Sequence, residues 1–562
     1  MSGSATSLTG TQGIAQQAPA FASGSTLEST SGLDFDAVVI GAGISGLYQL
    51  HLLRGLGMRV RVFEAGTGVG GVWYWNRYPG ARFDSESYSY GYSFSQELLD
   101  EWDWTEHFAP QPETERYLNF FTDKFDLRRD IQFSSRVRAA HFDDKNRCWE
   151  ITLVDGSRCT ARFLVTAVGP LSAPTYPRFA GMDDFKGEAF HTGLWPKHPV
   201  SFEGKRVAVI GTGATGVQAI TEIAKTVDQL TVFQRRPNWC TPLHNRPIDK
   251  QEMEQIRAGY EALFRRCKET SACFVHTVDP RSTFEVTDEE RAAFWEKLYL
   301  TPGFGIWQGN FRDMMTDREA NRLISEIVAG KIRARVKDPK IAEMLIPTDH
   351  GFGTRRVPQE TFYYEVYNQS NVNLVSMLDT PIKRITQTGL ETSERQFEFD
   401  MIIYATGFDA ITGSLDRIDI RGLNATSLKK KWAGGLETFM GVMIEDFPNM
   451  FMVAGPHTAL GNVPRSIEYN VEWVSGLIGH LRKHELSLAS ARPEAVAQWT
   501  DFVKLKAEGL LSNEVDSWMT GVNQNVDGKQ VRSIVRYSGS APDYRAWCDR
   551  VAGHGYQELM VC

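Results

Sequence analysis

Two copies of one pattern, a buried strand followed by a glycine loop and a helix, constrain this chain more than any other feature. In the first copy the predicted buried strand 36–40 leads into Gly41-Ala-Gly43-Ile-Ser-Gly46 and an apolar stretch of helical length. The first glycine allows a tight turn, the second lets backbone amides approach a pyrophosphate, and the third lets the helix pack on the strand. The next strand ends at Glu64, roughly 20 residues on, where an acid meets ribose hydroxyls.

The second copy keeps the three glycines but lacks the acid. Its glycines are Gly211, Gly213 and Gly216. The strand after its helix runs instead into Arg235 and Arg236. Cations at this place suit a ribose 2′-phosphate, which a carboxylate would repel. We therefore expect FAD at the first site and NADPH at the second, in an α/β fold with two Rossmann-like dinucleotide-binding domains.

The elements around these loops predict the domain organisation. Hairpins feed two buried strands that end in Ala-x-Gly, at 163–169 and 401–407, so the chain is expected to return to both domains and the FAD domain to be discontinuous. The predicted units are a disordered tail over 1–32, an FAD-binding domain over 33–170 and 386–562, an NADPH-binding domain over 171–240 and 341–385, and a helical insertion over 241–340.

Composition and charge exclude several classes of protein. Of 562 residues 42% are hydrophobic, but no apolar run reaches the ~18 residues that a membrane-spanning helix needs. The 61 basic and 69 acidic residues give a net charge of −8, which argues against nucleic-acid binding. Seven scattered cysteines without a CxxC pair exclude a zinc ribbon and a thioredoxin-like pair. No targeting peptide is recognisable, so we expect a cytoplasmic protein, and no protein partner is predicted.

Two further stretches combine glycines with aromatic residues and indicate the chemistry. One runs from Gly70 through Gly71, Trp73 and Trp75 to Asp84, and the other is Phe185-Lys-Gly187-Glu-Ala-Phe-His191-Thr-Gly-Leu-Trp195-Pro. Here the chain resembles the type I Baeyer–Villiger monooxygenases, flavoproteins that insert oxygen beside a ketone carbonyl. The second stretch fits that family's FxGxxxHxxxW(P/D) pattern at every fixed position. Trp195 favours the ketone branch, since related N- and S-oxygenating enzymes carry Phe or Tyr there. The resemblance covers about residues 33 to 540.

The resemblance implies roles for single residues. Arg355 takes the place of a 2′-phosphate ligand, and Arg356 that of the active-site arginine. Asp84 matches the acid that pairs with this arginine, although alone it could equally be a turn acid. Trp518 matches a tryptophan on a mobile loop that contacts the nicotinamide cofactor. Further cofactor contacts are implied for Gly71, Trp73, Trp75 and Asp84.

The implied reaction explains why an arginine is needed. NADPH and O2 would generate a C4a-peroxyflavin, whose peroxide must be an anion to attack a small-molecule ketone. A fixed guanidinium favours that anion and the later oxyanion. Arginine does so without risk of deprotonation. The product would be an ester or a lactone.

Other interpretations stay open at this point. N- or S-oxygenation needs a protonated hydroperoxide and no anion-stabilising arginine. A pyridine nucleotide-disulfide reductase would need a cysteine pair, which the sequence lacks. A non-enzymatic flavoprotein that senses NADPH is a third alternative. The loop 521–529 looks longer than usual in this family and resembles the loop of members that act on large rings. The ketone is therefore expected to be cyclic, and its ring size stays open. His457 either lines the pocket or is a structural histidine.

Overall fold

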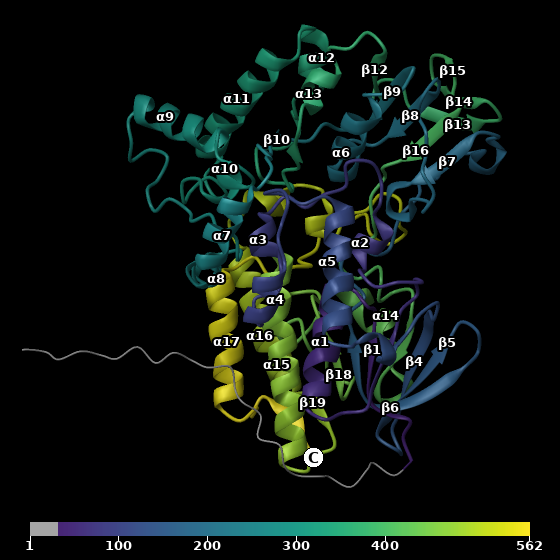
Figure 1. Cartoon of the computed structure of the whole chain (residues 1–562), viewed down its shortest axis with the longest axis vertical. Helices are drawn as coiled ribbons and strands as arrows, with labels where there is room; N and C mark the ends of the chain where they lie inside the picture. The colour runs from purple at the N-terminus through teal and green to yellow at the C-terminus, as the bar shows by residue number, and fades with distance from the viewer. Residues whose placement is uncertain (1–31) are drawn as a thin grey trace, which may run out of the picture.

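The computed structural model describes residues 32–562, so the tail predicted over 1–32 lies, apart from Gly32, outside the described residues. The first of two large sheets has the order β17-β4-β5-β6-β1-β2-β3, with β18 added beside β6 (Figure 1). Its strands are β1 Phe35–Ile40, β2 Val60–Phe63, β3 Ile131–Gln132, β4 Val137–Asp143, β5 Cys148–Leu153, β6 Arg158–Thr166, β17 Asp419–Arg421 and β18 Met450–Met452. β1 is parallel to both neighbours, β2 and β6. Its last four residues are apolar and buried, as expected for a parallel strand whose two faces are both covered.

The second sheet repeats this design with the order β12-β9-β8-β16-β7, and all its neighbouring strands are parallel. Its strands are β7 Glu188–His191, β8 Arg206–Ile210, β9 Gln229–Gln234, β12 Val372–Ser376 and β16 Met401–Tyr404. The second glycine loop follows β8, as the first follows β1. The two sheets therefore present their loops in equivalent positions, as expected for two Rossmann-like units.

One strand departs from the domain boundaries expected from the sequence. β16 falls within 386–562, the segment assigned to the FAD domain, yet it pairs with β7 and β8 of the second sheet. The chain therefore returns to the first sheet only after Tyr404, with β17 and β18. A short apolar strand ending in Ala-x-Gly fits either sheet, so its local pattern does not reveal its partner.

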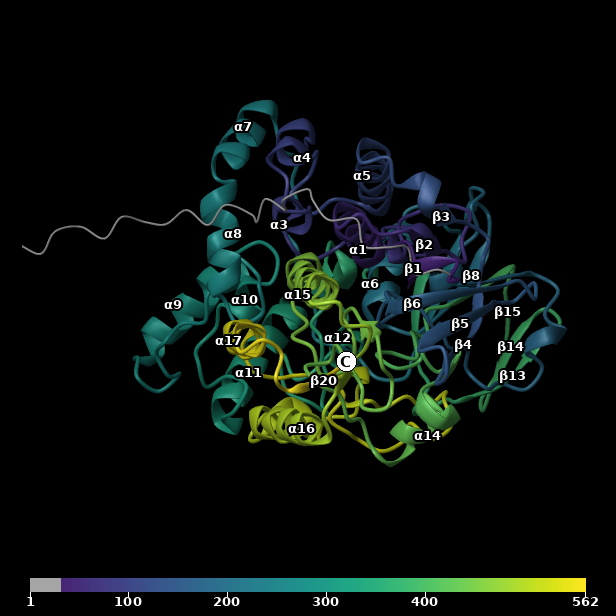
Figure 2. The ribbon, with the colours of Figure 1, turned by 90° about the horizontal axis from the view of Figure 1, so that it is seen from below.

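Long helices cover the sheets and carry the glycine loops. The first loop opens α1 Ile44–Gly55, and the second opens α6 Ala214–Ile223. α1 packs against the late helix α15 Val463–Lys483 (Figure 2), where Tyr48 Oη donates to Glu472 at 3.0 Å. The remaining helices outside the insertion are α2 Val72–Trp75, α3 Ser87–Tyr90, α4 Gln96–Glu101, α5 Gln111–Lys124, α13 Tyr363–Val366, α14 Leu428–Lys431, α16 Pro493–Ala507 and α17 Ala541–Gly553. Within 32–562 no helix has both the length and the apolar character needed to cross a membrane.

The segment between the two halves of the second unit is helical. It contains α7 Lys250–Ala258, α8 Tyr260–Glu269, α9 Asp288–Tyr299, α10 Gly305–Gln308, α11 Arg318–Arg335 and α12 Pro339–Met344. Both views place α9 and α11 on the side of the molecule away from β4 and β5 (Figures 1 and 2). The segment is closed at its base by β10 Thr241–Pro242, which pairs with β11 Gln359–Glu360. This pairing fixes the chain just after Arg356.

Three short antiparallel strands and one terminal pair complete the fold. β13 Ile382–Thr386, β14 Gly389–Thr392 and β15 Gln396–Glu398 form a small sheet ahead of β16. β19 Ala489–Ala491 pairs with β20 Leu559–Val561. Neither sheet contributes to the site described below.

Candidate active site

A cavity of about 1600 Å³ collects residues from both glycine loops and from the insertion. Every residue predicted for the site lines this cavity, except Gly46 and Gly216. A Cβ at Gly46 would lie 1.9 Å from the carbonyl oxygen of Gly41, and one at Gly216 would lie 2.3 Å from that of Gly211. These two glycines let each helix approach its own loop, which is the packing role that the motif predicts.

The first loop is held from both sides. The buried Glu64 carboxylate accepts hydrogen bonds from the backbone N–H of Ala42 at 2.8 Å and of Gly66 at 2.6 Å. Burial raises the pKa of Glu64. On the other side, a Cβ at Gly71 would lie only 2.8 Å from Cα of Gly43, so the two glycines meet backbone to backbone.

Trp73 and Trp75, two of the tryptophans predicted to contact a cofactor, differ in burial. Trp73 is buried, and its Nε1 donates to Tyr90 Oη at 3.1 Å, whereas Trp75 is half-buried. Both side chains belong to α2, which begins directly after Gly71. The glycine turn and the two tryptophans therefore form one wall of the cavity beside the first loop.

Both helix N-termini fit a phosphate group. α1 begins after Gly43 and α6 after Gly213, and neither start has a side-chain cap. The first N–H groups of a helix have no partner within the helix and favour an anion. A Cβ at Gly213 would have no neighbour within 4 Å, which leaves space at the second loop. The two loops therefore fit the pyrophosphates of two dinucleotides.

Three arginines gather beyond the second loop. Asp349 pairs with Arg236 at 3.0 Å and with Arg355 at 3.1 Å. Partial burial and the neighbouring Arg236 lower the pKa of Arg355, against the opposing effect of Asp349. Arg235 is exposed and has no ion-pair partner among residues 32–562. Three cations against one carboxylate leave a net positive site, which suits a 2′-phosphate.

Asp84 and Arg356 lie together on the cavity wall. Arg356 Nη2 donates to Asp84 Oδ2 at 2.6 Å, and the Asp84 side chain is buried. The same carboxylate oxygen accepts from the backbone N–H of Gln359 at 3.3 Å, which lies on β11. Asp84 therefore connects the first unit to the strand that closes the insertion.

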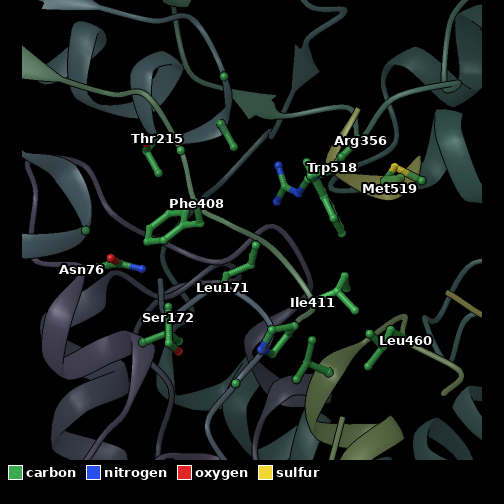
Figure 3. Close-up of a pocket in the computed structure, with 18 of the residues that line it drawn as sticks. Asn76, Leu171, Ser172, Thr215, Arg356, Phe408, Ile411, Leu460, Trp518 and Met519 are labelled. Carbon is green, nitrogen blue, oxygen red and sulfur yellow. The ribbon is translucent and has the colours of Figure 1, made fainter. Parts of the chain in front are cut away.

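Arg356 keeps one nitrogen free of protein partners. Its Nη1 is buried and has no hydrogen-bond partner among the described residues. The guanidinium carbon lies 5.9 Å from the centre of the Phe304 ring. Both Arg356 and Trp518 point into the cavity (Figure 3). One donor of Arg356 is thus available to a ligand.

Gln218 is a site residue that the motifs did not reveal. It lies on α6, and its Nε2 contacts Asp84 Oδ1 at 3.4 Å and the carbonyl of Arg82 at 3.1 Å. Tyr78 Oη donates to Gln218 Oε1 at 2.7 Å. Gln218 therefore connects the second nucleotide unit to Asp84. A glutamine within the apolar helix that follows the second loop was the available signal.

The FxGxxxHxxxW stretch connects the two units, but its histidine and tryptophan do not line the cavity. It forms β7 and the turn after it, where His191 Nδ1 accepts from the N–H of Gly193 at 3.0 Å. His191 Nε2 donates to the carbonyl of Thr175 at 3.2 Å, and burial lowers the pKa of His191 to about 4. His191 is therefore neutral and positions the connection between the sheets.

The loop that follows Trp518 is attached to the body of the protein. Trp518 begins a short 3-10 helix, and Lys529 at the far end of the loop bonds to Asp409 at 2.5 Å. His457 is outside the cavity, and its Nε2 donates to the carbonyl of Ile534 at 2.9 Å. These contacts support a structural role for His457 rather than a place on the pocket wall.

Comparison with known proteins gives relatives along the whole described chain. Residues 36–250 match the flavin-binding monooxygenase-like family. The chain is 45% identical to 2-oxo-Delta(3)-4,5,5-trimethylcyclopentenylacetyl-CoA monooxygenase of Pseudomonas putida, over 93% of this chain and 97% of the relative. It is 39% identical to cyclohexanone 1,2-monooxygenase of Acinetobacter sp, over 94% and 97%. The crystal structure of OTEMO with FAD and NADP matches with a TM-score of 0.91 and 44% identity, over 94% of this chain and 100% of that chain.

Two Rossmann-like units that open onto one cavity define a dinucleotide-dependent oxidoreductase of the flavin monooxygenase class. The chain belongs to the type I Baeyer–Villiger monooxygenases, as its two motif stretches predict. The predicted fold class is confirmed by the same comparison.

Proposed function

We propose that this protein binds FAD at the first glycine loop and NADPH at the second, and uses O2 to convert ketones to esters or lactones. The Asp84–Arg356 pair in the shared cavity is the observation that carries this proposal. One relative is named for cyclohexanone and another for a 2-oxo cyclopentenyl compound, which supports a cyclic substrate. OTEMO, crystallised with both cofactors, supports their use here.

When bound, FAD and NADPH supply the reduced flavin that activates O2. Arg356 then provides a permanent positive charge and a free N–H at Nη1. A fixed cation favours an anionic oxygen nucleophile and the oxyanion that forms when it adds to a carbonyl. Arg356 is therefore the catalytic residue of the proposal.

Asp84 acts through Arg356 and is a positioning residue. Its carboxylate accepts from Arg356 Nη2 and from the backbone of Gln359. An arginine side chain has many rotamers, so a fixed acceptor reduces the entropy lost when the cation contacts a ligand. Gln218 contributes to the same arrangement from α6.

The other predicted site residues are assigned to one or the other cofactor. Glu64, Gly71, Trp73 and Trp75 surround the first loop and are assigned to FAD. Arg235, Arg236 and Arg355 are assigned to the 2′-phosphate of NADPH. Trp518 is assigned to its nicotinamide end.

The decisive experiment is Arg356→Ala. The variant should retain FAD and anaerobic reduction by NADPH, while ester formation from cyclohexanone falls about 100-fold or more, because one oxyanion donor typically contributes that much. Flavin absorbance and gas chromatography of the product measure the two steps separately. Asp84→Ala should reduce ester formation about tenfold with the same reduction rate. Near-normal ester yield in Arg356→Ala would remove Arg356 from the mechanism.

The same variant separates this function from N- or S-oxygenation. Attack by a sulfide does not require an anionic oxygen, so sulfoxide formation from methyl phenyl sulfide should survive in Arg356→Ala. Equal loss of ester and sulfoxide would point to general damage. If the wild-type protein oxygenates amines and sulfides but no cyclic ketone, the N- or S-oxygenating alternative is correct.

A further inference from the structure

Another arginine that lines the cavity, Arg536, has no part in the mechanism above. Arg536 lies in the segment that leads to α17, and its Nη2 donates to Ser512 Oγ at 3.2 Å. Its Nε is buried without a hydrogen-bond partner among residues 32–562. No carboxylate of the described chain forms an ion pair with it. The protein therefore holds a largely uncompensated guanidinium on the wall of this cavity.

Such an arrangement is costly, and two other arginines with little exposure are each paired with a carboxylate. Removing a charge from water is unfavourable unless a counter-charge or hydrogen bonds replace the water. The buried Arg465 pairs with Glu468 at 3.0 Å, and the half-buried Arg335 pairs with the buried Glu360 at 2.6 Å. Burial lowers the pKa of Arg536 to about 10, yet the group remains charged at neutral pH. The missing counter-charge suggests that a ligand supplies it.

The residues around Arg536 fix this segment at the cavity. The next residue, Tyr537, is buried, stacks on Trp499 at 5.6 Å and also lines the cavity. Ser512 belongs to a short 3-10 helix, whose Leu511 N–H donates to the carbonyl of Met315 at 3.0 Å. Arg536 thus lies where the insertion meets the C-terminal segment, near the loop of Trp518.

We propose that Arg536 forms a subsite for an oxyanion on the substrate, so that the preferred ketones carry a carboxylate remote from the carbonyl group. This inference rests on the proposed function and narrows its substrate class. A guanidinium binds a carboxylate through two parallel N–H donors, and Arg536 has its Nε free for such a contact. The subsite adds a charge requirement to a cavity that otherwise selects by shape. Arg356 acts at the ketone and Arg536 at the distant group.

The test uses matched pairs of ligands on the FAD-containing enzyme with NADP⁺. The probes are ketocarboxylates in which a tether of one, two or three methylene groups joins C2 of cyclohexanone to a carboxylate. Each is compared with its methyl ester. Binding is followed through the flavin absorbance, which requires no turnover. At least one carboxylate should bind about tenfold more tightly than its ester, since hydrogen bonds to charged groups contribute about that factor.

Variants assign the preference to Arg536. Arg536→Met keeps the length of the side chain and should abolish the preference, and Arg536→Lys should restore part of it. Arg532→Met is the matched control, because Arg532 is exposed on the same segment and pairs with Asp516 at 2.7 Å. This control should keep the wild-type preference. Equal affinity within every pair, or a preference that persists in Arg536→Met, overturns the subsite.

The outcome is separable from that of the proposed function. Conversion of the neutral methyl esters to lactones, without a carboxylate preference, would leave the monooxygenase intact and remove the subsite. A carboxylate preference that depends on Arg536, without conversion of any ketone, would support the subsite and contradict the function. Retained FAD in Arg536→Met shows that the variant is folded.

Discussion

The two glycine loops of this protein have the same backbone but different support. Gly41 and Gly211 adopt φ of 104° and 111°, and their N–H groups donate to the carbonyls of Phe63 in β2 and Phe233 in β9. The residue that follows this phenylalanine is Glu64 in the first unit and Gln234 in the second. Glu64 turns into its loop, whereas Gln234 Nε2 donates to the carbonyl of Met344 in the insertion. The second loop therefore lacks the carboxylate contact that Glu64 makes with the first, and the three arginines lie beyond it.

The loops also differ in how they are enclosed. Gly43 lies against Gly71, while Gly213 faces open space. An enclosed site suits a cofactor that stays bound, and an open site suits one that must enter and leave in every cycle. The comparison teaches that a shared motif fixes the shape of the phosphate site, while residues outside it set which dinucleotide binds and how long it stays.

The largest expected effect comes from the glycines that bring helix and loop together. Gly46→Ala should yield protein without FAD and without activity, because its Cβ would overlap the Gly41 carbonyl oxygen. Gly216→Ala should keep FAD but lose at least about 100-fold in its rate of reduction by NADPH. Flavin content after gel filtration and anaerobic reduction kinetics measure the two effects. Loss of FAD from both variants would show that the units do not act separately.

The next effect concerns the arginines of the second loop. Arg235→Ala should raise the KM for NADPH about tenfold, since Arg235 has no competing carboxylate. Arg236→Ala and Arg355→Ala should have smaller effects, because both side chains already share Asp349. The KM for NADH serves as the control and should stay within about twofold for all three. A larger effect of Arg355→Ala than of Arg235→Ala would reverse this order.

The sequence predicted the loops well because glycine spacing and strand burial are local properties. It could not place β16, since an apolar strand of four residues fits either sheet. The pairing of Asp84 with Arg356 was implied by the family resemblance, because the two residues are 272 positions apart and no local pattern connects them.

The residues that the sequence missed are defined by their surroundings. Gln218 and Asp84 meet only because α6 packs beside the first unit, with 134 positions between them. Arg536 stands out because no carboxylate of the described chain pairs with it, and no sequence pattern predicts the absence of an ion pair. Sequence reasoning therefore located the two glycine loops, while the connections between the units required the structure.

The smallest expected effect tests the acid that distinguishes the loops. Burial raises the pKa of Glu64, and its ionised form is the better acceptor for ribose hydroxyls. FAD affinity should therefore fall as the pH drops through this raised pKa, because protonation removes the charge that the ligand requires. In FAD-free protein the same protonation relieves a buried charge, so the contribution of Glu64 to stability should increase as the pH falls.

Glu64→Gln provides the matched variant, because it places in the first loop the side chain that the second carries as Gln234. FAD affinity at neutral pH should fall only a few-fold, about 1 kcal/mol, since an amide oxygen still accepts a hydrogen bond. The acid-dependent loss of FAD, followed by flavin fluorescence, should flatten in this variant. The KM for NADPH should be unchanged at every pH, because the carboxylate lies only at the first loop. A pH profile identical to that of the wild-type protein would mean that another group controls FAD release, and that the loops differ in charge without differing in acid sensitivity.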